Sequence, residues 1–202
     1  MAYRSQYKTT ERNRMTAELV TPPASEPVTV AQAKKHLAIG TDTTHDEQLA
    51  WLIESSRQQW EHDTDSGVIS QSWRVQFELI DGLFIELPKS PLASVTAVQY
   101  YDLNNTLQTI SPTDYYVDTA NRRIHLAYGK NWPVTLDRWD GVTVNYVVGY
   151  ADAAAVPAIV KQAMLLLIGH YFENRDMLLS EAMQSLKPYE MLVRRYMRSS
   201  YP

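Results

Sequence analysis

The chain has 202 residues, a formal net charge of −4 and no cysteine. This length allows one large domain or a core that carries an inserted subdomain. The lack of cysteine excludes disulfides and thiolate metal sites, and the acidic balance gives no general indication of nucleic-acid binding.

Residues 1–26 are predicted to form an N-terminal arm. They are mostly polar, show no apolar periodicity and contain Pro22 and Pro23, which favour extended backbone. The start is basic but has no apolar run, so we expect no signal peptide. Two alternatives stay open: a tail without fixed structure, or an arm that orders against a partner.

Two helices are predicted next, over residues 29–37 and 44–63. Thr29 is a suitable N-cap for the first, and Thr44 with Glu47 forms a capping-box pattern for the second. The second helix has an apolar stripe and a polar side that we expect to face away. The stripe consists of Leu49, Leu52, Ile53, Ser56 and Trp60, and the polar side of Glu54, Arg57, Gln58 and Glu61.

The hydrophobic period changes to two between residues 68 and 150. Alternation is clearest at 72–79, which places Trp73, Val75 and Phe77 on one face. Asn104 and Asn105 are typical of a hairpin turn. Short strands without intervening helices predict a small antiparallel sheet or barrel. The further strands are expected at 83–87, 95–101, 106–110, 115–117, 123–127 and 142–148.

The segment 157–176 predicts a central, buried helix around which other elements pack. Its apolar residues recur at helical spacing, and Pro157 suits a first helical position. A last short helix is expected after Lys187. The fold class is therefore predicted as α+β, a mainly helical bundle with an inserted antiparallel β subdomain. The expected domains are 27–67 with 151–202 as the helical core, and 68–150 as the insert.

No constellation of residues predicts catalysis or a bound cofactor. His62, Asp63 and Asp65 lie at a helix end, where such residues serve the backbone. His170 and Glu173 share a helix face at the spacing of part of a carboxylate-bridged metal motif, but no second copy of it exists. No Gly-x-Ser-x-Gly, phosphate-binding or dinucleotide-binding motif is present. We therefore expect a non-enzymatic protein without metal or cofactor.

The C-terminal helix supplies the candidate interface residues. Aromatic residues and arginines dominate the energy of many interfaces, and this helix combines both. Its basic end could contact phosphates, a protein partner or solvent. The candidates for a subunit or partner interface are Tyr189, Leu192, Arg194, Arg195, Tyr196 and Arg198. We expect Leu192 and Val193 to face inward and the arginines and Tyr196 to face outward.

Two segments stand out by their order and spacing: residues 27–37, PVTVAQAKKHL, and residues 87–95, LPKSPLASV. The first resembles the opening motif of the head–tail connector (adaptor, or head-completion) proteins of tailed bacteriophages, and the second resembles the strand entry of the long, β-inserted branch of that family. Two departures are the N-terminal arm and the serines at 55 and 56, where the family usually has alanine. The other similar segments are 46–57, 98–102, 114–118, 144–150 and 156–175.

The resemblance implies a structural virion protein made in the host cytoplasm and located at the head–tail interface. Such connectors form a ring of about twelve subunits under the portal protein. They extend the channel for the passing genomic DNA, which they do not bind specifically, and support a stopper or tail-completion protein; no membrane is involved. The alternative is a DNA-packaging accessory factor with nucleic-acid-binding or nuclease activity.

Two finer expectations follow for a connector. Repeating a subunit of net charge −4 around a ring predicts an acidic or polar channel wall that lets DNA slide. The segment 186–201 is expected to be the main portal-docking element, because a short helix is marginal unless it packs against a partner.

Overall fold

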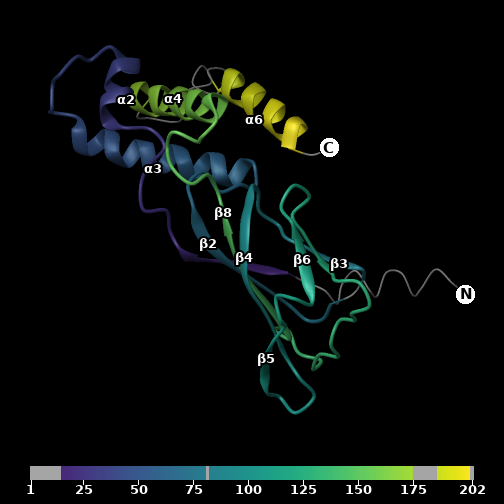
Figure 1. Ribbon diagram of the computed structural model, residues 1–202. Helices are drawn as coiled ribbons and strands as arrows, with labels where there is room; N and C mark the ends of the chain where they lie inside the picture. The colour runs from purple at the N-terminus through teal and green to yellow at the C-terminus, as the bar shows by residue number, and fades with distance from the viewer. Residues whose placement is uncertain (1–14, 81, 175–185, 201–202) are drawn as a thin grey trace, which may run out of the picture. The chain divides into compact units, whose positions relative to one another are not determined.

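The computed structural model describes residues 15–80, 82–174 and 186–200 (Figure 1). For residues 198–200 it describes the backbone and not the side chains. The chain divides into two compact units. The β unit is drawn from residues 1–22 and 70–149, and the helical unit from residues 23–69 and 150–202. Each unit has its own cluster of buried hydrophobic side chains.

The helical unit is organised around one central helix, as the sequence predicts. This helix, α4, contacts each of the other three helices in the described part of the unit (Figure 1). Its buried residues include Met164, Leu167 and Ile168, which pack with Leu49 and Trp60. The helices are α2 (Val30–Leu37), α3 (Asp46–Asp63), α4 (Ala158–Glu173) and α6 (Lys187–Ser200).

The two predicted helix starts have different outcomes. At α2 the Thr29 cap is confirmed: Thr29 Oγ1 accepts from the Gln32 amide at 3.2 Å, and Gln32 Oε1 accepts from the Thr29 amide at 2.9 Å. At α3 the predicted capping box is wrong. The amide and hydroxyl of Thr44 both donate to Asp42 Oδ1, at 2.9 and 2.7 Å, and α3 begins two residues later. A local side-chain turn has competed with the cap.

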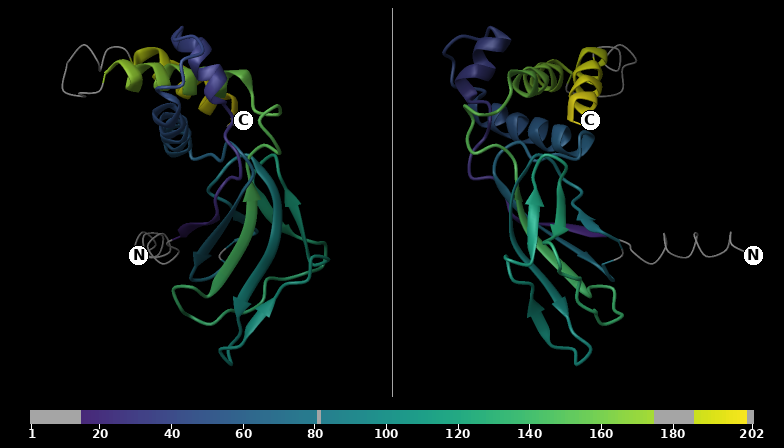
Figure 2. Two further views of the ribbon diagram at one scale, coloured as in Figure 1. Left: turned by 90° about the vertical axis from the view of Figure 1, so that its left-hand side faces the viewer. Right: turned by 45° about the vertical axis from the view of Figure 1, so that its right-hand side comes forward.

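The β unit consists of a five-stranded and a three-stranded sheet, with all named strands paired antiparallel (Figure 2). Along β8, residues 142, 144, 146 and 148 are buried and alternate with half-buried ones. Ile85 and Ile124 of the smaller sheet join the same core as Phe77 and Val144 of the larger one. The larger sheet has the order β1 (Thr16–Thr21), β2 (Gln71–Phe77), β8 (Val142–Val148), β4 (Leu92–Tyr101), β5 (Leu107–Thr109), and the smaller β3 (Phe84–Glu86), β7 (Arg123–Leu126), β6 (Tyr115–Asp118).

The hairpin predicted at Asn104 and Asn105 is confirmed between β4 and β5. Asn105 has a positive φ of 59°, a conformation that asparagine tolerates well. Asp102 Oδ1 accepts from the amides of Thr106 and Asn104, at 3.0 and 2.9 Å, and Asp102 Oδ2 accepts from Gln108 Nε2 at 3.0 Å. The bonds from Thr106, Gln108 and Asn104 hold the pKa of Asp102 below its ordinary value. The turn is therefore stabilised from its first residue.

The predicted α+β class is confirmed, but the description as a mainly helical bundle is wrong. The sheets enclose a hydrophobic cluster of their own, with Val75, Ile124 and Val144 fully buried. A segment with its own hydrophobic core is a second structural unit, and not a small insertion in a helical bundle. No helix in the described part of the chain is long and apolar enough to span a membrane.

The arm predicted over residues 1–26 requires a correction. Residues 16–21 form β1, which pairs with β2 from Thr16 opposite Gln76 to Thr21 opposite Ser72. All six side chains of β1 are exposed, so backbone hydrogen bonds hold the strand. An edge strand held in this way needs no apolar alternation, which explains why the sequence pattern missed it. Residues 1–14 lie outside the described residues.

Candidate functional site

Helix α6 is anchored by two tyrosines, one helical repeat of seven residues apart. Tyr189 and Tyr196 are 6% and 8% exposed, and their rings pack edge-on against Trp60 of α3, with centroids 6.2 and 5.1 Å away. Tyr189 Oη donates to Asp63 Oδ2 at 2.7 Å. Burial and this bond raise the pKa of Tyr189. These contacts hold one face of α6 against the helical unit.

The predicted interface residues of α6 therefore separate into two groups. The expectation that Tyr196 faces outward is wrong, because its ring packs against Trp60 and is buried there. Tyr189 is also buried, while Leu192 is half-buried. Arg194 and Arg195 are exposed, and Arg194 lies 3.8 Å from Glu190. The side chain of Arg198 lies outside the described residues.

The accessible side of α6 is centred on Met191, which is 70% exposed. Met191 follows the buried Tyr189 by two residues, about 200° around a helix. Lys187, Arg194 and Arg195 are exposed on the same side. We call Lys187, Met191, Arg194 and Arg195 the Met191 face. It combines a large apolar side chain with three basic ones.

The inner side of α3 is as predicted, but two residues expected to face away, Arg57 and Glu61, do not; the side chain of Glu61 is 12% exposed and accepts from the Val68 amide. Leu49, Ile53 and Trp60 are buried, with Trp60 completely inaccessible. Arg57, expected to face away, is 6% exposed. Its Nε donates to Glu26 at 2.9 Å and its Nη1 to Glu61 at 3.0 Å. Burial opposes the charged guanidinium, but the bonds to Glu26 and Glu61 prevail and raise the pKa of Arg57.

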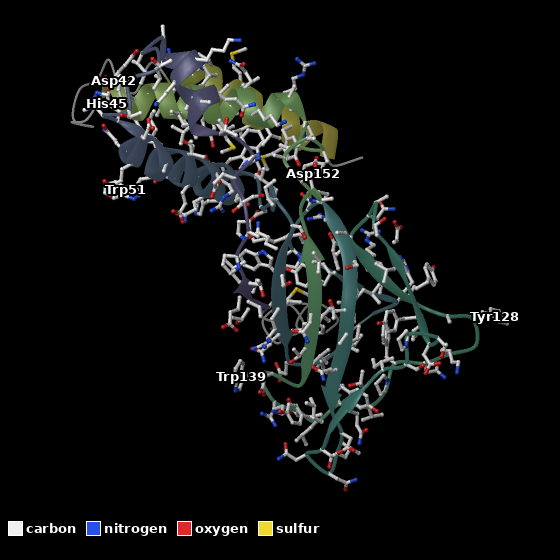
Figure 3. The ribbon with its side chains drawn as sticks, turned by 60° about the vertical axis from the view of Figure 1, so that its left-hand side comes forward. Asp42, His45, Trp51, Tyr128, Trp139 and Asp152 are labelled. Atoms are coloured by element: carbon white, nitrogen blue, oxygen red, sulfur yellow. The ribbon has the colours of Figure 1, made fainter. Side chains whose placement is uncertain are left out.

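The outer side of α3 presents a tryptophan that the sequence analysis did not single out. Trp51 is 62% exposed, and Figure 3 shows its side chain pointing away from the neighbouring helices. It is flanked by Glu47 and Glu54, both exposed, one turn to either side. We call Glu47, Trp51 and Glu54 the Trp51 face. The sequence spacing could have predicted this exposure, because Trp51 follows Leu49 of the apolar stripe by two residues, which is about 200° around the helix.

The titratable residues with a pattern of interest in the sequence lie at the end of α3 and on α4. No group of three or more His, Cys, Asp or Glu side chains in the described residues could hold a metal ion. His170 is 7% exposed and lines a cavity of about 230 Å³ together with His36 and Glu173. Asp63 accepts from Tyr189, while the side chain of His62 is 85% exposed.

Comparisons with known proteins identify structural neighbours. No protein-family profile matches the chain, and no curated protein matches its sequence. Several solved structures are similar to it. A chain from the virion of the native gene transfer agent (GTA) particle has a TM-score of 0.72 at 23% identity, covering 90% of this chain and 94% of that one.

Two further neighbours come from GTA necks. A chain from the neck of the empty particle, with C6 symmetry, has a TM-score of 0.69 at 24% identity, covering 86% of this chain and 94% of its own. A chain from the neck of the native particle, with C12 symmetry, has a TM-score of 0.67 at 23% identity, covering 91% and 94%. The shared fold therefore includes both units of the chain.

Proposed function

We propose that this chain is a structural protein of the neck of a phage-like particle. The observation that carries the proposal is the fold shared with GTA neck chains over 94% of their length. A match of that extent includes the helical unit and the β unit in their order along the chain. It agrees with the resemblance of the sequence to head–tail connectors of tailed phages. The protein then acts in the virion as an architectural component, without a chemical step.

The finer proposal is an adaptor ring of about twelve subunits between the portal protein and a stopper or tail-completion protein. Neck chains of this fold occur in particles described with C6 and C12 symmetry, which supports a ring. A ring of acidic subunits would extend the DNA channel with a wall that repels the DNA backbone. The genome would then pass without being held.

The surface proposed to mediate assembly is the outer side of α6. Arg194 and Arg195 are its exposed candidates, and arginine is enriched at energetically important interface positions. Tyr189, Leu192 and Tyr196 support this surface from beneath, because they hold α6 on the helical unit. Charged, exposed residues on a well-anchored helix suit contact with another subunit of the particle.

The test is particle assembly without this chain. Heads should package DNA and fail to acquire tails, and the purified protein, alone or with portal, should give rings by negative-stain electron microscopy and mass measurement. Loss of packaging would contradict the proposal and favour the accessory factor. A metal-dependent nuclease activity of the purified monomer would also favour that alternative.

A further inference from the structure

We propose that the Met191 face of one copy binds the Trp51 face of the next copy, in a repeated head-to-tail contact. This inference rests on the proposed ring and names the contact that builds it. It replaces the portal protein, the partner expected from the sequence for residues 186–201, by a second copy of this chain. Three properties of the two faces lead to it: where they lie, what charge they carry and how they repeat.

The two faces lie on opposite sides of the contact between α3 and α6. Inside the helical unit these helices meet through Trp60 on one side and Tyr189 and Tyr196 on the other. Trp51 lies nine residues before Trp60, which is about 180° around α3, and Met191 lies about 200° around α6 from Tyr189. The faces therefore point away from each other, and one chain cannot satisfy both by folding back on itself.

The faces are complementary in charge and alike in apolar character. The Trp51 face carries Glu47 and Glu54, and the Met191 face carries Lys187, Arg194 and Arg195, with Glu190 beside Arg194 at 3.8 Å. Each face has one large exposed apolar side chain, 62% exposed at Trp51 and 70% at Met191. Opposite charge steers and orients such a contact, and arginine stacks favourably on tryptophan.

Two different faces on opposite sides of one unit produce a heterologous contact. A repeated heterologous contact closes into a ring when the rotation between copies permits, whereas a single self-complementary face stops at a dimer. Two unlike, complementary faces therefore suit a ring component. An unrelated partner would need to match only one of them.

A cysteine trap tests the contact directly, because the natural chain contains no cysteine. The variant Trp51→Cys/Met191→Cys has its two thiols on opposite sides of one chain. They can join only between copies, with Cα atoms within about 7 Å. Under mild oxidation we expect a ladder of covalent oligomers on a non-reducing gel. Each single variant should give no species above a dimer.

Charge exchange supplies the second test. Glu47→Arg/Glu54→Arg and Arg194→Glu/Arg195→Glu should each raise the concentration needed for assembly about tenfold or more. Combining all four substitutions in one chain should restore assembly. Mixing the two double variants should also restore rings, built from alternating copies, because both contacts between unlike variants are attractive and the contacts between like variants are repulsive. Lys35→Glu, an exposed reversal on α2, is the matched control and should leave assembly unchanged.

The outcomes separate this contact from the proposed function. Rings without the cysteine ladder would overturn the contact and leave the neck protein standing. Neither rings nor ladder, in solution or on portal-bearing heads, would overturn both. If Arg194→Glu/Arg195→Glu still forms rings but no longer joins portal-bearing heads, the Met191 face docks on portal and the inference falls.

Discussion

The helical unit and the β unit are held together in different ways. In the helical unit, a few side chains connect segments far apart in the chain: Trp60 with α6, and Arg57 with Glu26. In the β unit, backbone pairing runs through a five-stranded sheet, and burial is spread along β2, β4 and β8. Single substitutions should therefore act differently in the two units.

This difference also separates inner from outer surfaces. In the helical unit, one helix carries a fully buried tryptophan and a largely exposed one, nine residues apart. The buried one anchors α6, and the exposed one is available to a partner. The same type of side chain is thus buried in the core or exposed to solvent according to the helix face on which it lies.

The largest effect is expected from Trp60→Ala. Trp60 is inaccessible and contacts both anchoring tyrosines of α6, so its loss should reduce the free energy of unfolding by about 3–5 kcal/mol. Denaturant unfolding of the monomer measures this. Trp51→Ala is the matched control on the same helix and should change stability by less than about 0.5 kcal/mol. Equal losses would contradict the distinction between the two faces.

Phe77→Ala should produce the corresponding loss in the β unit. Phe77 is 1% exposed in the core between the sheets, and its removal should cost about 3 kcal/mol. Hydrogen exchange locates the effect: amides of β2, β8 and β4 should lose protection while those of α3 and α4 keep it. Equal loss of protection in α4 would show that the two units unfold as one.

Arg57→Ala should destabilise the helical unit by about 2–3 kcal/mol, because it leaves the carboxylates of Glu26 and Glu61 without their buried cation. Thermal unfolding at neutral pH measures the loss. Arg74→Ala is the control in the β unit: its side chain is 40% exposed and lies 3.6 Å from Glu18, so the cost should be below about 1 kcal/mol. If Arg57→Ala leaves the thermal stability unchanged, the ion pair of Arg57 with Glu26 does not stabilise the helical unit.

Tyr189→Phe is the mildest change. It keeps the ring against Trp60 and removes the bond to Asp63, so we expect a loss of about 1 kcal/mol. Faster amide hydrogen exchange confined to α6 would show that the loss of stability is local to that helix. Tyr116→Phe, at an exposed site in β6, should have no measurable effect. If α6 exchanges as slowly in Tyr189→Phe as in the natural protein, the ring contacts alone anchor it.

Several parts of the fold could be predicted because their signals are local. The alternation along β2 and β8, the asparagine turn at 104–105 and the apolar run of α4 each lie within one short segment. The Thr29 cap is local as well, since it joins residues three apart. For these elements the periodicity of burial and the preferences of the backbone decide the structure.

Other parts could not be predicted because they depend on distant segments. The position of Arg57 on its helix predicts that it faces solvent. Its burial depends on Glu26, 31 positions earlier in the chain, which folding places beside it. Tyr196 reads as an exposed aromatic until α6 packs on Trp60. β1 has no apolar pattern, because its pairing with β2 satisfies the backbone alone.

The sequence by itself determined which segments become helices and strands in the described chain, apart from β1, because the pattern of apolar residues in each of those segments matches one period. It also determined that the chain is acidic and without thiols. Only the tertiary structure decided which polar and aromatic residues are buried and which remain accessible, because burial depends on the neighbours that folding supplies. The pairing of Tyr189 and Tyr196 with Trp60 turns one side of α6 inward. That packing leaves Met191 and the arginines on the outside.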